Sequence, residues 1–217
     1  MDHMQTVQSC EISGIRLQQI VEDRELREAG VLWPVTTDVA AVLMDEFPDE
    51  QLQGKRVLEL GAGTGALGIA AAALGARVTL TDLAAVVPLT TQNVKLNSGT
   101  LARGGSAVVK VHCWGESTAE LEPPFDVILA CETLYWGGWD LFQDDTREGQ
   151  FKTLLSCSKL DTKIIVGFTI RDKQREVGFL LEHCGKDFAC RLSPRMTSTL
   201  EDLQDGDVCL VILQPHK

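Results

Sequence analysis

The sequence lacks several patterns that would assign it to a familiar class. Tyr135 is the single tyrosine among 217 residues, and Trp139 stands four positions after it, so the Tyr-x-x-x-Lys pair of short-chain dehydrogenases is absent. The seven cysteines include no C-x-x-C pair and the four histidines have no metal-ligand spacing, which argues against a zinc site. An odd number of cysteines without such a pair is typical of reduced thiols, so we expect a cytoplasmic location that can extend to the nucleus.

Neither charge nor hydropathy favours nucleic acid or a membrane as a partner. Asp and Glu outnumber Lys and Arg by 31 to 20, which gives a net charge of −11 that repels phosphate backbones, and the basic residues form no cluster. No apolar run is long enough to span a bilayer, and the first residues lack the basic region and apolar block of a signal peptide. The charge favours a basic protein or a cationic side chain as partner. We expect a monomer.

Strand and helix patterns alternate along the chain, which is typical of a mostly parallel sheet covered on both faces. The order predicts a doubly wound α/β sheet of seven strands that ends in an antiparallel strand, with a short β extension at the N-terminus. No repeat or linker interrupts the chain, so residues 1–217 are expected to form one domain. Strands are predicted at 56–60, 77–82, 107–113, 125–131, 163–170, 187–192 and 207–213, and helices at 36–47, 66–74, 86–97, 147–158 and 173–184.

The stretch RVLELGAGTGALG, from Arg56 to Gly68, is an apolar strand followed by a glycine-rich turn and indicates a site for a nucleotide-like ligand. Its glycines satisfy two fingerprints. GAGTGA and GTGALG both fit the dinucleotide pattern, whereas ELGAGTG fits the pattern of S-adenosylmethionine enzymes. Other residues must therefore decide which cofactor binds.

Glu59 favours S-adenosylmethionine. A central parallel strand is buried on both faces, so a charge within it is costly unless something uses it. A carboxylate at this position can reach the cationic amino group of a methionine-type ligand, whereas dinucleotide folds usually carry an apolar residue there. Asp82, at the end of RVTLTD, can accept both ribose hydroxyls of either cofactor and does not discriminate between them. The absence of a second domain for a dehydrogenase substrate favours S-adenosylmethionine again.

The segments VLELGAGTGALGIAAA, TLTDL, NVKLN, HCWGE and FDVILACETLYW follow one another in this order, and GVLWPVTTDVAAVL precedes them. Together they resemble methyltransferase family 16, and the similarity covers Gly30 to Leu213. The resemblance implies a seven-stranded, Rossmann-like methyltransferase domain with its core over about residues 30–213, and S-adenosylmethionine as the cofactor. Most family members methylate lysine in other proteins, chaperones and translation factors among them, so it also implies a protein substrate of that kind.

The resemblance implies a role for each cofactor-binding residue at the matching positions of this sequence. Trp33 would close over the methionine end of the cofactor, Asp82 would bind its ribose, and Trp114 would lie against the adenine face. The backbone of Cys113 would lie near the exocyclic amine of the adenine. The residues that would form the cradle are Glu59, Gly61, Gly63 and Gly65.

On the substrate side, the resemblance implies that Ala130 and Cys131 line the methyl-transfer channel. Glu132 and Tyr135 match the family's acidic-x-x-aromatic signature beside the target nitrogen. The signature usually begins with Asp, and the extra methylene of Glu132 could shift the carboxylate outward. The substrate nitrogen and its methylation state therefore stay open.

These residues lead to the interpretation of an S-adenosylmethionine-dependent methyltransferase with a protein lysine ε-amine as its expected target. Two alternatives stay open: methylation of a small molecule or of another group such as histidine or an N-terminal amine, and a cofactor-binding adaptor without activity. Some residues also have a plain structural interpretation. Trp33 could pack at a helix start, Asn93 and Asn97 are expected to end a helix, and Arg171 is expected on an exposed loop, although it could face the mouth of the site.

Overall fold

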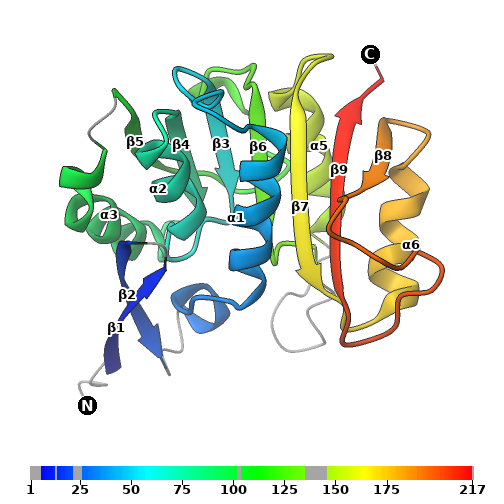
Figure 1. Ribbon diagram of the computed structural model, residues 1–217, viewed down its shortest axis with the longest axis horizontal. Helices are drawn as coiled ribbons and strands as arrows, with labels where there is room; N and C mark the ends of the chain where they lie inside the picture. Colours follow the sequence, from blue (N-terminus) through cyan, green and yellow to red (C-terminus); the bar gives the residue numbers. More distant parts are fainter. Residues whose placement is uncertain (1–5, 13, 22–25, 102–103, 135–145, 217) are drawn as a thin grey trace.

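The computed structural model describes residues 6–12, 14–21, 26–101, 104–134 and 146–216. Its main sheet has seven strands in the order β5-β4-β3-β6-β7-β9-β8, in which β9 is antiparallel to both of its neighbours. A separate two-stranded sheet, β1-β2, lies near the N-terminus (Figure 1). The predicted α/β class, with an antiparallel last strand and a short N-terminal extension, is confirmed.

The element bounds follow the predicted segments closely. The predicted strand at 107–113 ends at Val111, because the chain turns away there into a loop that reaches the site described below. In the part of the chain that the structure describes, no helix is both long and apolar enough to cross a membrane. The strands are β1 Thr6–Ile12, β2 Ile15–Val21, β3 Arg56–Leu60, β4 Arg77–Asp82, β5 Ser106–Val111, β6 Val127–Cys131, β7 Lys163–Thr169, β8 Phe188–Leu192 and β9 Val208–Pro215. The helices are η1 Arg27–Gly30, α1 Val35–Glu46, α2 Ala66–Ala73, α3 Val87–Leu96, η2 Ser98–Thr100, η3 Ala119–Leu121, α5 Arg147–Cys157 and α6 Lys173–His183.

Alternate residues of the central strands point to opposite faces of the sheet, which sorts the core into two clusters. On β3, Val57 belongs to the cluster beneath α1 and α2, whereas Leu58 belongs to the cluster beneath α5 and α6. On β6, Leu129 lies on the first face and Ala130 on the second. Val94 of α3 also packs against the first cluster. Helices α1, α2 and α3 therefore cover one side of the sheet, and α5 and α6 cover the other (Figure 1).

Two buried asparagines of α3 hold the N-terminal hairpin against the rest of the protein. The Asn93 Oδ1 accepts a hydrogen bond from the Gln18 N–H at 2.7 Å, and its Nδ2 donates to the Gln18 carbonyl at 2.9 Å. Asn97 makes the same pair of bonds with Arg16, at 3.0 and 2.6 Å. Each amide thus pairs with one residue of β2 as a neighbouring strand would.

The two asparagines differ in their place on α3 and in their further hydrogen bonds. Asn97 follows the last residue of α3 and ends the helix, as expected. Asn93 lies inside α3, and its Nδ2 also donates to the Thr64 carbonyl at 2.8 Å, in the turn between β3 and α2. Asn93 therefore connects the hairpin to that turn, a role that the sequence did not indicate.

We expect Asn93→Ala to destabilise the protein, because it removes the partners of the Gln18 N–H and carbonyl and of the Thr64 carbonyl. The free energy of unfolding should fall by about 1–3 kcal/mol, the range for buried polar groups left without a partner. Urea denaturation of the two proteins measures it. Lys95→Ala, at an exposed position of the same helix, is the control and should change the value by less than about 0.5 kcal/mol. Equal effects of the two substitutions would contradict the role of Asn93 in holding the hairpin and the turn.

Candidate functional site

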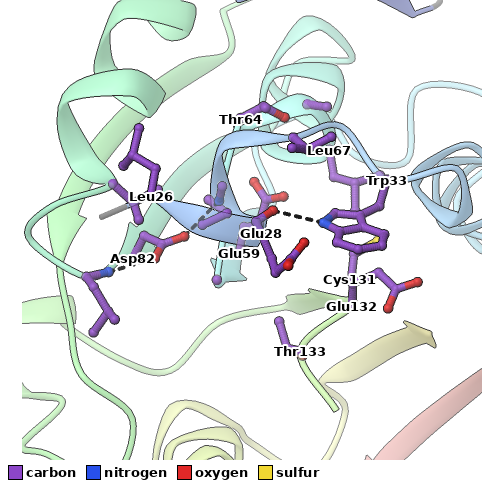
Figure 2. A pocket seen from close by; sticks show the side chains of 18 of the residues that line it. Leu26, Glu28, Trp33, Glu59, Thr64, Leu67, Asp82, Cys131, Glu132 and Thr133 are labelled. Atoms are coloured by element: carbon purple, nitrogen blue, oxygen red, sulfur yellow. Dashed lines mark hydrogen bonds between the residues drawn. The ribbon is translucent and has the colours of Figure 1, made fainter. Parts of the chain in front are cut away.

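A cavity of about 520 Å³ opens at the carboxyl ends of β3, β4 and β6. This is the edge at which ligands of open α/β sheets bind. Figure 2 shows three acidic side chains at the cavity: Asp82 at one side, Glu132 at the other and Glu59 between them. The volume lies within the range of small-molecule sites, about 300–1,000 Å³.

The turn between β3 and α2, residues 61–65, is called the glycine loop here and forms one wall of the cavity. Gly61, Gly63 and Gly65 all have positive φ, at +64°, +53° and +81°. Gly63 also lies against a neighbouring segment so closely that a Cβ would come within 2.9 Å of the Ala29 carbonyl oxygen. A side chain at this position would therefore both strain the backbone and push away the segment that covers the cavity.

Glu59 lies within β3 and lines the cavity, yet its residue is only 3% exposed. Its side chain points to the α2 face, where Oε2 accepts a hydrogen bond from the Gly68 N–H at 2.9 Å. A Cβ on Gly68 would lie 2.5 Å from that oxygen, so only glycine admits the contact. Burial raises the pKa of the Glu59 carboxyl to about 8, and the nearby Asp82 raises it as well.

Asp82, the last residue of β4, holds the middle of the glycine loop. Its Oδ2 accepts from the Gly63 N–H at 2.7 Å, and its Oδ1 accepts from the Leu83 N–H at 2.7 Å. Burial raises the pKa of this carboxyl above its usual range. Two carboxylates on adjacent strands therefore face one cavity, an arrangement that suits a ligand with a cationic group and hydroxyl donors.

The loop after β5 forms a second wall. The His112 N–H donates to the Asp82 carbonyl at 3.0 Å, which continues the β4–β5 pairing by one residue. The ring of Trp114 lies beside the glycine loop, since a Cβ on Gly61 would be 3.1 Å from its Cζ2. Thr153 of α5 approaches the His112 Nε2 at 3.5 Å. Sequence reasoning assigned no role to His112, although it is buried in the cavity wall and burial lowers its pKa.

Residues 26–33, called the η1 segment here, cover the cavity from the hairpin side. The Trp33 Nε1 donates to the Glu28 carbonyl at 3.0 Å (Figure 2), so the indole is held by the segment itself. The sequence predicted Trp33 as a site residue but did not indicate the other lining residues of the η1 segment, because an irregular segment carries no motif. The other cavity-lining residues of the η1 segment are Leu26, Glu28, Ala29 and Val31.

Glu132 follows β6 with a positive φ of +54°, which is uncommon for a residue other than glycine. Its Oε1 accepts from the Thr169 N–H at 3.1 Å and from the Thr169 hydroxyl at 2.8 Å. The Arg171 Nη1 lies 2.8 Å from its Oε2. Arg171 is partly exposed, as expected, but its side chain also lines the cavity.

Most of the predicted site residues meet at this one cavity. Gly65 does not line it and instead precedes α2 as its N-cap. The prediction that Ala130 lines a channel is wrong for its side chain, because the alternation along β6 turns it into the core beneath α5. Tyr135 lies outside the described residues. The predicted residues that line the cavity are Trp33, Glu59, Gly61, Gly63, Asp82, Cys113, Trp114, Cys131 and Glu132.

Comparison with known proteins agrees with this geometry. The family model described as lysine methyltransferase matches residues 15–182. Protein N-lysine methyltransferase METTL21A of Danio rerio is 36% identical over 77% of this chain and 72% of its own length, and that of Mus musculus is 34% identical over 75% and 70%. EEF1A lysine methyltransferase 3 of Xenopus tropicalis is 30% identical over 76% of this chain and 70% of its own length.

Solved structures share the fold at lower identity. A 16S rRNA N2 methyltransferase of T. thermophilus, in complex with AdoMet and guanosine, has a TM-score of 0.68 at 19% identity, over 97% of this chain and 50% of its own. Magnesium protoporphyrin IX methyltransferase of Synechocystis, with bound SAM, has a TM-score of 0.53 at 22% identity, over 83% and 77%. With the family match, these findings define the class: the chain belongs to the lysine methyltransferase family, as its motifs predicted.

The raised pKa of Glu59 predicts a pH dependence of stability in the absence of ligand. Between the ordinary value of 4.5 and about 8, the folded protein keeps this carboxyl protonated while the unfolded chain ionises it. The unfolding free energy should therefore fall as pH rises through this window, by up to about 1.4 kcal/mol per pH unit from this group. Glu59→Gln should remove that part of the slope.

Urea denaturation of both proteins at several pH values within the window measures the difference. Glu182→Gln, at an exposed position of α6, controls for loss of a carboxylate and should keep the wild-type slope. Parallel curves for the wild-type protein and Glu59→Gln would show that Glu59 is ionised throughout.

Proposed function

We propose that this chain transfers the methyl group of S-adenosylmethionine to the ε-amine of a lysine in another protein, with a chaperone or a translation factor as the expected substrate. The observation that carries the proposal is the cavity itself. Buried carboxyl groups from β3 and β4, those of Glu59 and Asp82, line it beside the glycine loop, and Glu132 lies at the side away from Asp82 (Figure 2). Glu59 and Asp82 can thus hold a ligand with cationic and hydroxyl groups, while Glu132 receives an amine.

The residues present fit S-adenosylmethionine. Glu59 can accept from the amino group of its methionine part, and Asp82 can accept from the ribose hydroxyls. Trp114, half-buried in the loop after β5, offers a face for the adenine. Bound there, the cofactor would supply an electrophilic methyl group on a sulfonium. The two structural neighbours with bound AdoMet or SAM support this choice of cofactor through their shared fold.

The task of the substrate side is to present a neutral amine in the right direction. A lysine amine has an unperturbed pKa of about 10.4, so it must lose a proton before it can attack. Burial and a nearby positive charge both lower that pKa. Glu132 would attract the incoming ammonium and orient the amine, and the proton would leave to water. Catalysis would then rest chiefly on alignment.

The relatives support a protein substrate. The name of EEF1A lysine methyltransferase 3 states its target, and METTL21A is named as a protein N-lysine methyltransferase. The net charge of −11 would favour association with a basic surface. Incubation with methyl-labelled S-adenosylmethionine and a cell lysate, followed by mass spectrometry of labelled bands, identifies the target. A labelled small molecule, a methylated histidine or N-terminal amine, or no label at all would each favour one of the alternatives instead.

S-adenosylhomocysteine should bind with micromolar affinity, about −8 kcal/mol, and NAD should not compete. Gly63→Arg should abolish binding, because the new side chain enters the cavity and displaces the η1 segment. Calorimetry on both proteins measures this. Gly178→Arg adds the same side chain at an exposed position with open space around it and should bind like the wild-type protein. Tight binding of NAD without a response to S-adenosylhomocysteine would overturn the choice of cofactor.

Trp114→Ala should weaken S-adenosylhomocysteine binding by about 1–3 kcal/mol, the range for loss of one aromatic face beneath a base. The variant should still unfold cooperatively, because the half-buried ring lines the cavity and belongs to none of the hydrophobic core clusters. A variant that unfolds, or that binds as tightly as the wild-type protein, would assign this tryptophan to packing.

Glu132→Gln should leave the affinity for S-adenosylhomocysteine nearly unchanged and reduce turnover on the identified substrate about 100-fold, as when positioning is lost. Glutamine keeps the size of the side chain and removes the charge that attracts an ammonium. Glu132→Asp should retain activity, because the family usually carries aspartate at this position. Wild-type turnover in Glu132→Gln would remove the main structural support for lysine as the target.

A further inference from the structure

One oxygen of Glu132 is left without a hydrogen bond. The side chain is 4% exposed, and its Oε1 already has two donors, both from Thr169. Within the described part of the chain, Oε2 has no hydrogen-bond partner. The Arg171 Nη1 is 2.8 Å away but outside the directions in which a hydrogen bond forms, so the contact balances charge and leaves the acceptor unused.

The guanidinium of Arg171, which pairs with this oxygen, also lies over the face of an aromatic ring. The guanidinium carbon lies 5.3 Å from the centre of the Trp33 ring, within the range of cation–π contacts. The Arg171 Nη1 also donates to the Thr169 carbonyl at 3.0 Å. A positive charge is therefore held between an indole face and a buried carboxylate, both of which line the cavity.

The same place suits a lysine ammonium better than a guanidinium. An ammonium carries three donors that can rotate toward Oε2, whereas the donors of a guanidinium are fixed in one plane. Arg171 can leave, because its side chain is 36% exposed and it stands on the loop between β7 and α6. Its backbone can stay in place meanwhile, held by the N–H that donates to the Glu176 Oε2 at 2.8 Å.

We propose that Arg171 is a specificity-determining residue that occupies the ammonium position between Trp33 and Glu132, and that the target lysine must displace it. The inference rests on the proposed lysine substrate. Arg171 takes no part in methyl transfer. Its ion pair with Glu132 selects among incoming groups. A cation that can donate a hydrogen bond to Glu132 replaces the guanidinium, whereas an uncharged group such as an alcohol does not compete with it.

The test is a titration with n-butylammonium, which has the charge and much of the stem of a lysine side chain, followed by NMR on protein saturated with S-adenosylhomocysteine. Arg171→Met keeps an apolar stem against Trp33 and removes the competing charge. It should bind n-butylammonium about 3- to 10-fold more tightly than the wild-type protein, as expected from loss of one partly exposed ion pair and one cation–π contact. Arg171→Lys should fall between the two.

Three controls isolate the effect. Glu132→Gln added to Arg171→Met should abolish the gain, and n-butanol, which lacks the charge, should bind all variants alike. Arg175→Met removes a neighbouring arginine of α6 that does not line the cavity, and it should leave the affinity unchanged. Equal or weaker n-butylammonium binding in Arg171→Met would overturn the proposal. The titration is repeated without S-adenosylhomocysteine, so that failure of the protein to bind that ligand counts against the proposed function and not against the role of Arg171.

Discussion

Two carboxyl groups buried on adjacent strands hold the glycine loop and the first turn of α2 by backbone amides. Asp82 accepts from the Gly63 N–H in the loop and Glu59 accepts from the Gly68 N–H in α2, so the chain is held on both sides of the start of α2. The rest of the site depends on this constraint. Gly63 has no room for a Cβ, because the Ala29 carbonyl of the η1 segment lies against it. Asn93 joins the loop to the N-terminal hairpin through the Thr64 carbonyl. Burial disfavours the charged form of both carboxyl groups, and the backbone hydrogen bonds that they accept offset part of that cost.

Much of the sheet could be predicted because its strands are short apolar runs separated by helical patterns, and Glu59 stood out as a charge within one of these runs. Interactions between segments that are distant in the sequence could not be predicted. The pairing of Asn93 and Asn97 with β2 looks in sequence like an ordinary helix end, because the pattern does not show which backbone lies opposite. The η1 segment has no periodicity at all. The side chain of Ala130 points into the core beneath α5, because alternation along β6 places it on the face opposite Leu129 and Cys131.

The sequence around Arg171 does not indicate its contacts, which come from other segments of the chain. An arginine just after a strand is usually solvated. Here three segments far apart in the chain meet around it: the η1 segment through Trp33, the end of β6 through Glu132, and the end of β7 through Thr169. Trp33, Glu132 and Arg171 all line the cavity that Glu59 and Asp82 also line. In the proposed function, Glu59 and Asp82 serve the cofactor, and Glu132 serves the substrate cation.

The proposed function implies that Glu59, which is protonated in the ligand-free protein, becomes charged when it meets the amino group of S-adenosylmethionine. Calorimetric titration of S-adenosylhomocysteine near neutral pH, in buffers with different ionisation enthalpies, counts the protons exchanged on binding. Because burial raises the pKa of Glu59 to about 8, the wild-type protein should release about one proton per ligand bound, and Glu59→Gln should release close to none. Binding of equal strength with no proton release from the wild-type protein would contradict the claim.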